Sequence, residues 1–430
     1  MKRKIEAQLL AWKEKTADRM PLIVNGARQV GKTYILRKFG EEQFKNTVYI
    51  NLETNLAVAS YFNDNISPER LLRYLEASTG ERIVPGETLI IFDEIQSCER
   101  ALTSLKYFCE EAPEFHIAAA GSLLGVAINR QHYSFPVGKV ETITLYPLDF
   151  EEYLWARGKD LLCQEIRSAY EQMSPLPDAL HQEALELYRE YLVIGGMPAC
   201  INAFLASGSF LEVPLVQNGV LDNYIADMAK YSSNTDSVKI RACYNSIPAQ
   251  LAKDNKKFQY KVVQKGGSAS LFGASIEWLN LSGVVLECHR IDHAMEPIAV
   301  HADLSAFKLY MGDVGLLTMK SGISQQTVLS GEGNTFMGAV TENYVAQQLS
   351  AKGYPLYYWE SNSIAEVDFV LQKGNQIIGI EVKKGEHVRS RSLSVFVKNY
   401  APAYSIRFST KNFGEKDGLK SVPLYAVFCI

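Results

Sequence analysis

Two groups of residues in this chain of 430 residues have the types and spacing of reactive sites. The first follows a short apolar run, residues 22–24, and reads GARQVGKT over residues 26–33. It matches the pattern G-x-x-x-x-G-K-[ST] at every fixed position. Main-chain N–H groups in such a loop, and at the start of the helix after it, point at one place where the helix dipole favours an anion. We predict that ATP phosphates bind to Gly26, Ala27, Arg28, Gln29, Val30, Gly31, Lys32 and Thr33.

The residue types in this loop suit phosphate and magnesium chemistry. Gly26 and Gly31 let the backbone bend around phosphate oxygens without a side chain in the way. Lys32 is expected to reach the β- and γ-phosphates, and the Thr33 hydroxyl to bind Mg²⁺. The alternative is a chance glycine loop, which the apolar run before it and the helical pattern after it disfavour.

An acidic pair, Asp93 and Glu94, ends a second apolar run 60 residues after Thr33. At the carboxyl end of a parallel strand, Asp93 is expected to hold Mg²⁺ and order Thr33, while Glu94 polarises the attacking water. Ser122 ends a further apolar run at 115–121. We expect its side chain to touch the γ-phosphate or the water; the alternative is an ordinary serine at the end of a strand.

The second reactive group lies near the carboxyl end. Asp368, Glu381 and Lys383 fit D-(x)n-E-x-K, with a glycine-asparagine turn between the two predicted strands. Residues i and i+2 of a strand share a face, so the three side chains are predicted to meet. With Glu342 from a preceding helix, the carboxylates of Asp368 and Glu381 would bind Mg²⁺, and Lys383 would orient a water. The alternative is a charged surface ladder on a hairpin.

The elements that must position these residues fall into four predicted domains. Alternating strands and helices over 1–150 predict an α/β domain with a parallel sheet, and with the nucleotide at the carboxyl ends of its strands. Residues 151–230 are predicted to form a helical lid or subdomain, and 231–300 a winged-helix-like module. Residues 301–430 carry the second reactive group.

A basic stretch in the third domain is a candidate DNA contact. Between residues 239 and 265, the only acidic residue is Asp254. This face is predicted to track phosphates, with a solvated lysine surface as the alternative. The cations are Lys239, Arg241, Lys253, Lys256, Lys257, Lys261 and Lys265.

Composition limits the compartment and the partners. A net charge of −4 gives no global case for nucleic-acid or membrane binding, so any basic surface must be local. Seven scattered cysteines without a C-x-x-C pair suit a reducing cytoplasm. The amino-terminal stretch 1–15 is charged and amphipathic rather than a signal peptide, and no run has the length of a membrane span. We therefore expect a cytoplasmic protein with no membrane partner.

Seven motifs in order resemble the prokaryotic two-part ATP-binding proteins that join an AAA-type domain to a C-terminal domain of unknown function. They read GARQVGKT, TLIIFDE, AAAGSLL, PLDFEEYL, GGMP, KLYMGDVGLL and AEVDFVL…IEVKKG. The resemblance implies an ASCE-type P-loop ATPase, a winged-helix module and a C-terminal domain with a PD-(D/E)XK restriction-nuclease-like fold. The family usually has arginine where this chain has Lys139, which cannot make the two-pronged contact of an arginine finger. Arg28 and Arg130 are the other candidates.

Three functions are consistent with these features. The first is an AAA-type switch that binds and hydrolyses ATP and moves the C-terminal modules, with DNA bound at 239–265 and in the C-terminal domain. The second is a Mg²⁺-dependent DNA nuclease gated by ATP. The third is a protein-interaction switch in which the nuclease fold has lost its catalytic activity and binds a protein partner.

Overall fold

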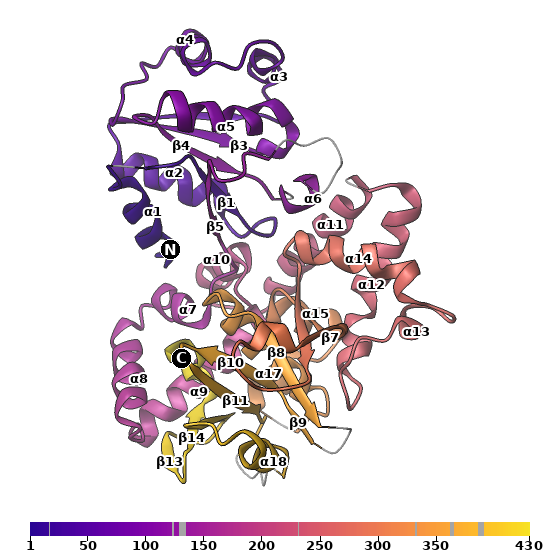
Figure 1. The fold of residues 1–430 in the computed structure, drawn as a ribbon. Coiled ribbons are helices and arrows are strands. Elements are labelled where there is room, and N and C mark those ends of the chain that lie inside the picture. Colours follow the sequence, from indigo (N-terminus) through magenta and orange to yellow (C-terminus); the bar gives the residue numbers. More distant parts are fainter. Residues whose placement is uncertain are drawn as a thin grey trace. The chain divides into compact units, whose positions relative to one another are not determined.

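The computed structural model describes residues 1–16, 18–122, 124–128, 135–230, 232–331, 333–361, 365–385 and 391–430. The chain forms two compact units (Figure 1). The amino-terminal unit comprises residues 2–146 with 281–283, and the carboxy-terminal unit comprises residues 147–280 and 284–430 with Met1. The predicted boundaries at 150, 230 and 300 remain predictions.

A five-stranded parallel sheet is the centre of the amino-terminal unit, with strand order β2-β3-β4-β1-β5. The three inner strands carry continuous apolar runs because both faces of the sheet are covered, whereas residues of the two edge strands alternate in burial. The predicted α/β architecture with an amino-terminal parallel sheet is confirmed. The strands are β1 (Leu22–Asn25), β2 (Asn46–Asn51), β3 (Thr88–Asp93), β4 (His116–Ala120) and β5 (Glu141–Thr144).

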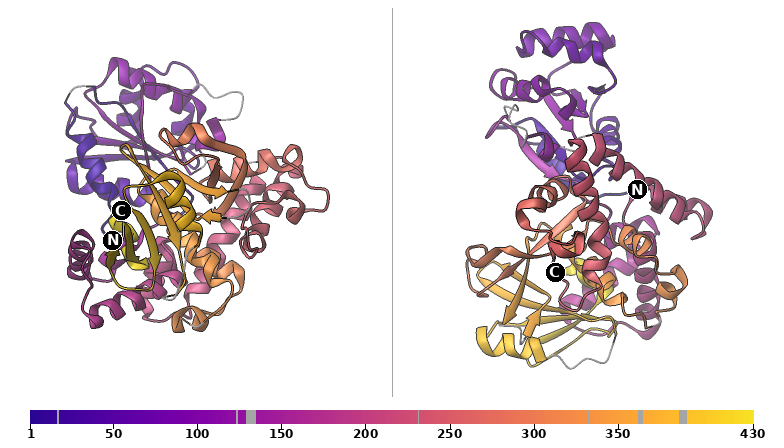
Figure 2. Two further views of the ribbon diagram at one scale, coloured as in Figure 1. Left: turned by 60° about the horizontal axis from the view of Figure 1, so that its bottom comes forward. Right: turned by 90° about the vertical axis from the view of Figure 1, so that its right-hand side faces the viewer.

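Helices cover both faces of this sheet, as Figure 1 and the two views of Figure 2 show. α4 and α5 bury leucines against one face, and α2 packs on the other with α1 beside it. The sheet edge that holds the first reactive group is therefore the end of a rigid layer. The helices are α1 (Ile5–Lys13), α2 (Lys32–Gln43), α3 (Leu56–Ala59), α4 (Pro68–Thr79), α5 (Glu99–Glu111) and α6 (Leu124–Ile128).

The carboxy-terminal unit begins with helices. A capping box at Asp149 starts the first of them: the Asp149 carboxylate accepts from the Glu152 N–H, and the Glu152 side chain accepts from the Asp149 N–H. The predicted helical region after residue 149 thus begins as expected. The helices are α7 (Phe150–Ala156), α8 (Asp160–Gln172), α9 (Asp178–Ile194), α10 (Pro198–Ser207), α11 (Val213–Lys230), α12 (Asn234–Leu251), α13 (Tyr260–Val263) and α14 (Ala269–Leu281).

Two sheets follow in the same unit. The first has strand order β7-β6-β8-β9 and the second β10-β11-β12-β14-β13. The antiparallel pair β6–β7 comes after α12–α14, which is the order that a winged helix requires, and that assignment remains a prediction. The strands are β6 (Val285–Ile291), β7 (Ala302–Met311), β8 (Leu356–Ser361), β9 (Ala365–Val367), β10 (Phe369–Lys373), β11 (Gln376–Val382), β12 (Ser405–Ser409), β13 (Gly414–Lys416) and β14 (Leu419–Pro423). The helices are α15 (Val314–Ser321), α16 (Gln325–Ser330), α17 (Met337–Ala351) and α18 (Arg391–Tyr400).

Two sequence-based assignments in this unit were wrong. The strand predicted over 366–371 is interrupted at Asp368, because β9 pairs with β8 in one sheet and β10 pairs with β11 in the other. The pattern over 308–317 predicts a strand running into a turn; the strand is present and ends at Met311, but helix α15 follows in place of the turn. The reason is the Asp313 side chain, which accepts a hydrogen bond from the Leu316 N–H and starts a helix there.

Among the described residues, no single helix has both the length and the apolar character needed to cross a membrane.

Candidate functional site

The predicted phosphate loop connects β1 to α2 and bends sharply at both glycines. Gly26 has φ +140°, and a Cβ there would lie 2.1 Å from the Leu145 carbonyl oxygen. Gly31 has φ +99° immediately before α2, and Gln29 has φ +67°. The positive φ angles at positions 26 and 31 suit glycine. Together with Gln29, they turn the main chain of the loop back on itself at the helix N-terminus.

Lys32 lies over this loop rather than in solvent. Only 8% of the residue is exposed. Its Nζ donates to the Gly26 carbonyl at 2.8 Å and to the Ala27 carbonyl at 2.7 Å. A buried ammonium group is therefore held by the loop itself, next to the point at which the α2 N-terminus begins.

Thr33 and Asp93 meet across the sheet edge, as the sequence predicted. The Thr33 hydroxyl donates to Asp93 Oδ2 at 2.8 Å, and the Tyr49 hydroxyl donates to the same oxygen at 2.7 Å. Burial, together with the hydrogen bond to Asp93, raises the pKa of Tyr49 to about 12, so the phenol remains a donor at neutral pH. A hydroxyl and a carboxylate are hard oxygen ligands, so this pair fits Mg²⁺.

Glu94 directly follows β3 in a left-handed backbone conformation, with φ +51°. Its Oε2 accepts from Gln96 Nε2, and the Ser122 hydroxyl lies 3.5 Å from the same oxygen. Ser122 is therefore close to the predicted catalytic carboxylate. The sequence analysis missed Gln96. No spacing rule singles it out, although it follows the acidic pair by only two residues.

Gly121 explains why Gln96 fits there. A Cβ at Gly121 would lie 2.6 Å from Gln96 Oε1, so a larger residue there would displace the glutamine amide from its place beside Ser122. The three side chains of Glu94, Gln96 and Ser122 thus form one polar group at the ends of β3 and β4.

The three candidates for the arginine-finger role, Lys139, Arg28 and Arg130, lie in different surroundings or outside the described residues. Lys139 forms an ion pair with Glu110 at 2.9 Å, and both side chains are more than one third exposed. This pair lies on the surface, and it holds the lysine to α5. Arg28 is part of the loop itself. Arg130 lies outside the described residues.

The carboxy-terminal acidic group is arranged differently from the prediction. Glu342, on α17, is buried, and its Oε1 accepts from Lys308 Nζ at 3.0 Å and also from the Tyr310 hydroxyl. Its Oε2 accepts from Lys256. Although burial opposes ionisation, Lys256 and Lys308 hold the pKa of Glu342 below its ordinary value. Both carboxylate oxygens are thus engaged by cations of the chain itself.

Asp368 and Glu381 belong to different hydrogen-bond networks. Asp368 Oδ2 accepts from the Val382 N–H at 2.7 Å, and burial together with the nearby Glu342 raises the pKa of Asp368 to about 6. Glu381 pairs instead with Arg407, at 3.1 Å to its Nε, and with Lys383, also at 3.1 Å.

The magnesium site predicted from Glu342, Asp368 and Glu381 does not fit this arrangement. Within the described ranges, no group of three or more His, Cys, Asp or Glu side chains is placed to hold a metal ion. The physical reason is that lysines and an arginine supply the positive charge that the carboxylates need. The sequence could not show this, because Lys256 and Lys308 are distant from the motif along the chain.

The basic stretch 239–265 is only partly available to an external partner. Lys256 pairs with Glu342, and Lys257 pairs with Glu360. Lys261 and Arg241 are exposed. Two of the seven cations predicted to track phosphates are therefore committed to carboxylates inside the unit.

Three family models match the chain. Residues 18–154 match a model described as an AAA domain. This part of the chain is an AAA-type domain. Residues 185–327 match a domain of unknown function (DUF8612), and residues 337–427 match another domain of unknown function (DUF4143). The predicted AAA-type domain and the C-terminal domain of unknown function are thereby confirmed, whereas the nuclease-like fold and the winged helix remain predictions.

Two curated relatives share one short stretch with this chain. They are the uncharacterized proteins Mb2031c of Mycobacterium bovis and Rv2008c of Mycobacterium tuberculosis, each 37% identical over 79 residues. The alignment spans 18% of this chain and 18% of each relative.

Several solved ATPase structures are similar at a low level. The Walker-type ATPase PABY2304 of Pyrococcus abyssi has a TM-score of 0.44 and 15% identity, over 74% of this chain and 95% of its own. ORC2 of Aeropyrum pernix has a TM-score of 0.35 and 12% identity, over 79% and 94%. DnaA of Aquifex aeolicus has a TM-score of 0.31 and 11% identity, over 65% and 89%. The assignment of the AAA-type domain rests on the family model and on the geometry of the loop.

Proposed function

We propose that the AAA-type domain binds Mg-ATP at residues 26–33 and hydrolyses it. The observation that carries this proposal is the hydrogen bond of 2.8 Å between Thr33 and Asp93, which unites two motifs 60 residues apart. A glycine loop alone would bind many anions. A glycine loop with a lysine over it and a hydroxyl–carboxylate pair beside it suits a nucleotide with a bound Mg²⁺.

Each residue then has a role. Lys32 neutralises charge on the β- and γ-phosphates, and Thr33 and Asp93 would hold Mg²⁺, which offsets the charge that develops during phosphoryl transfer. Glu94 orients and polarises the attacking water. Gln96 and Ser122 position Glu94, since both contact its Oε2.

The test is nucleotide binding by Lys32→Ala. The variant should lose at least about a hundredfold in affinity for a fluorescent ATP analogue, because the buried ammonium group over the loop is removed. The matched control is Lys45→Ala, an exposed lysine of the same unit paired with Glu87. The control should bind as the parent protein does. Unchanged affinity in Lys32→Ala would refute the assignment.

We further propose that the carboxy-terminal unit is a binding module that responds to the nucleotide, without nuclease activity of its own. The supporting observation is that Lys256 and Lys308 engage both oxygens of Glu342. Incubation of DNA with Mg²⁺ or Mn²⁺ tests this proposal. Cleavage that is lost in Asp368→Ala and Glu381→Ala would overturn it and favour the ATP-gated nuclease.

Two kinds of partner remain for this module. It is a nucleic acid if the protein is a DNA-binding switch, and a protein if it is an interaction switch. DNA affinity at low salt that falls as salt rises supports a nucleic acid. Retention on a protein partner, with no DNA affinity at low salt, supports the interaction switch. The rate of ATP turnover with and without DNA connects the result to the AAA-type domain.

A further inference from the structure

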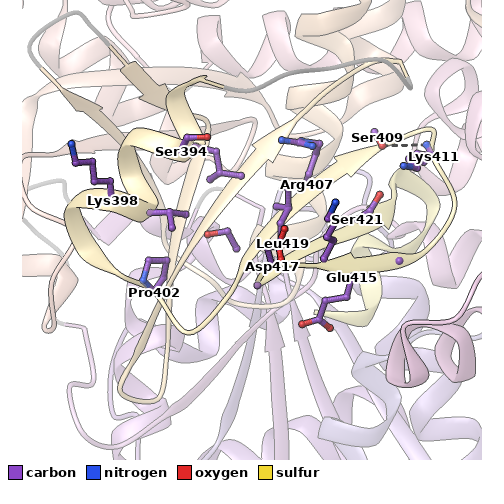
Figure 3. A pocket seen from close by; sticks show the side chains of 16 residues that line it. Ser394, Lys398, Pro402, Arg407, Ser409, Lys411, Glu415, Asp417, Leu419 and Ser421 are labelled. Carbon is purple, nitrogen blue, oxygen red and sulfur yellow. Dashed lines mark hydrogen bonds between the residues drawn. The ribbon is translucent and has the colours of Figure 1, made fainter.

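A groove of about 800 Å³ crosses the exposed face of the second carboxy-terminal sheet (Figure 3). One wall is α18 and the other is the β13–β14 hairpin, with β12 and β14 as the floor. α18 packs over β9 and β11, and the β12–β14 half of this face lines the groove. The volume is in the range of known small-ligand sites.

We propose that this groove binds a phosphate group through Arg407, with serine hydroxyls around it and lysines at its rim. The proposal does not depend on the ATP site, because the groove lies in the other unit and uses other residues.

Arg407 is held in a fixed orientation with its outer edge uncommitted. Its Nε donates to Glu381 Oε2 at 3.1 Å, and the Glu381 side chain is only 5% exposed. In the described part of the chain, the terminal nitrogens of Arg407 have no hydrogen-bond partner, and 23% of the side chain is exposed. A guanidinium group fixed through Nε presents two further donors in one plane, the geometry that matches two oxygens of a phosphate.

Hydroxyl groups surround this arginine. Ser421 is the register partner of Arg407 on the neighbouring strand, and the two lie side by side in Figure 3. Ser409 lies two residues along β12, with its hydroxyl accepting from the Lys411 N–H at 3.2 Å. Ser405, on the groove floor, is 1% exposed, and its hydroxyl has no hydrogen-bond partner among the described residues. A buried donor without a partner is unfavourable unless a ligand or water satisfies it.

The charge of the lining is locally positive in a chain that is acidic overall. Lys398, Lys411 and Lys416 line the groove with Arg407, against Glu415 and Asp417. Lys398 lies on α18, across the groove from Arg407 in Figure 3. This distribution of charge favours an anionic ligand over a neutral or cationic one.

The lining also indicates which part of a ligand is recognised. None of the lining residues that the structure describes is aromatic, so they offer no surface on which a base can stack. Arginine, lysine and serine side chains are the usual contacts to phosphate oxygens. The phosphate therefore belongs either to a nucleic-acid backbone, bound without sequence preference, or to a small phosphorylated molecule.

The experiment uses the full chain carrying Lys32→Ala, so that the loop of the AAA-type domain does not bind the probes. Affinity for a fluorescein-labelled DNA oligonucleotide is measured by anisotropy over a range of salt, and affinity for pyrophosphate by calorimetry. Arg407→Ala should weaken binding by at least about tenfold, and Lys398→Ala/Lys411→Ala should lower the salt slope. The matched control is Lys373→Ala, an exposed lysine on β10 of the same sheet outside the groove.

Arg407→Ala leaves the buried Glu381 without one partner and can disturb the fold, whereas Lys398 and Lys411 are exposed. The double lysine variant therefore keeps the test valid. Loss of oligonucleotide binding in the groove variants supports a nucleic-acid backbone as the source of the phosphate. Loss of pyrophosphate binding alone supports a small phosphorylated ligand. If the groove variants bind both probes as the Lys373→Ala control does, or if neither probe binds the parent chain, the proposal is overturned.

Discussion

Lys308→Met tests whether the carboxy-terminal acidic group is an internal ion network. Lys308 is fully buried, and its Nζ lies 3.0 Å from Glu342 and 2.5 Å from Glu366. Burial alone would lower the pKa of Lys308, but the adjacent carboxylates hold it well above the ordinary value. The methionine is similar in length and removes only the charge, so that Glu342 keeps Lys256 but loses a buried cation.

The magnitude follows from burial. Breaking a buried ion pair by removing one partner costs about 3–5 kcal/mol of unfolding free energy, because a charge remains inside without compensation. The neighbouring pair Lys257–Glu360 supplies the matched control, since Lys257 and Lys308 form a β-bridge but the Lys257 side chain is 25% exposed. Lys257→Met should cost clearly less than Lys308→Met, because the Lys257 side chain is partly exposed and water screens the charge that remains.

The assay is urea denaturation, with hydrogen exchange over 302–311 and 337–351 to report on this unit separately, because the chain need not unfold in one step. Lys308→Met/Glu342→Gln should recover much of the loss, since it removes the uncompensated charge. A loss below about 1 kcal/mol for Lys308→Met would refute the network, as would a double variant less stable than the single one.

Three further predictions concern the AAA-type domain. Glu94→Gln should keep ATP affinity within about twofold and lower turnover by at least about a hundredfold, because binding and water activation use different groups; equal turnover in a phosphate-release assay would contradict this role. Gly26→Ala should destabilise the amino-terminal unit by about 1–3 kcal/mol, because its φ of +140° and the 2.1 Å approach to the Leu145 oxygen exclude a Cβ; a melting temperature equal to the parent's would contradict it. Burial lowers the pKa of His116 from 6.5 to about 4 in the folded chain. As pH falls, the unfolded chain therefore binds a proton at His116 before the folded chain does, and the free energy of unfolding decreases between pH 6.5 and about pH 4. His116→Phe should reduce the loss between pH 7 and pH 5 by about 1–2 kcal/mol, measured by denaturation at both pH values.

The amino-terminal sheet was predictable because its signals are local. Each inner strand of this covered parallel sheet is a continuous apolar run, and the loop motif is contiguous in sequence. The contact between Thr33 and Asp93 followed from the rule that parallel strands end at the same edge. The pairing of Gln96 with Glu94 was not predictable, because it depends on the left-handed turn at Glu94 and the space left by Gly121.

The carboxy-terminal unit was harder to predict because its strand pairing depends on contacts between segments that are distant in the sequence. The split of one apolar run at Asp368 into strands of two sheets depends on which partners are near, β8 and β11, and not on the run itself. The sequence pattern therefore predicted that residues 366–371 are extended, but not which sheet each part joins.

By itself, the sequence determined the identity and the order of the chemical groups: a glycine loop with a lysine, an acidic pair after a strand, and three carboxylates with a lysine near the end. Only the tertiary structure decided which other groups the carboxylates face. Asp93 accepts from Tyr49 as well as from the expected Thr33, Glu342 faces two lysines, and Glu381 faces an arginine. The physical reason is that a buried charge is stabilised by whichever opposite charge or donor the fold brings within hydrogen-bond distance, and the partners of Glu342 come from strands and loops far along the chain.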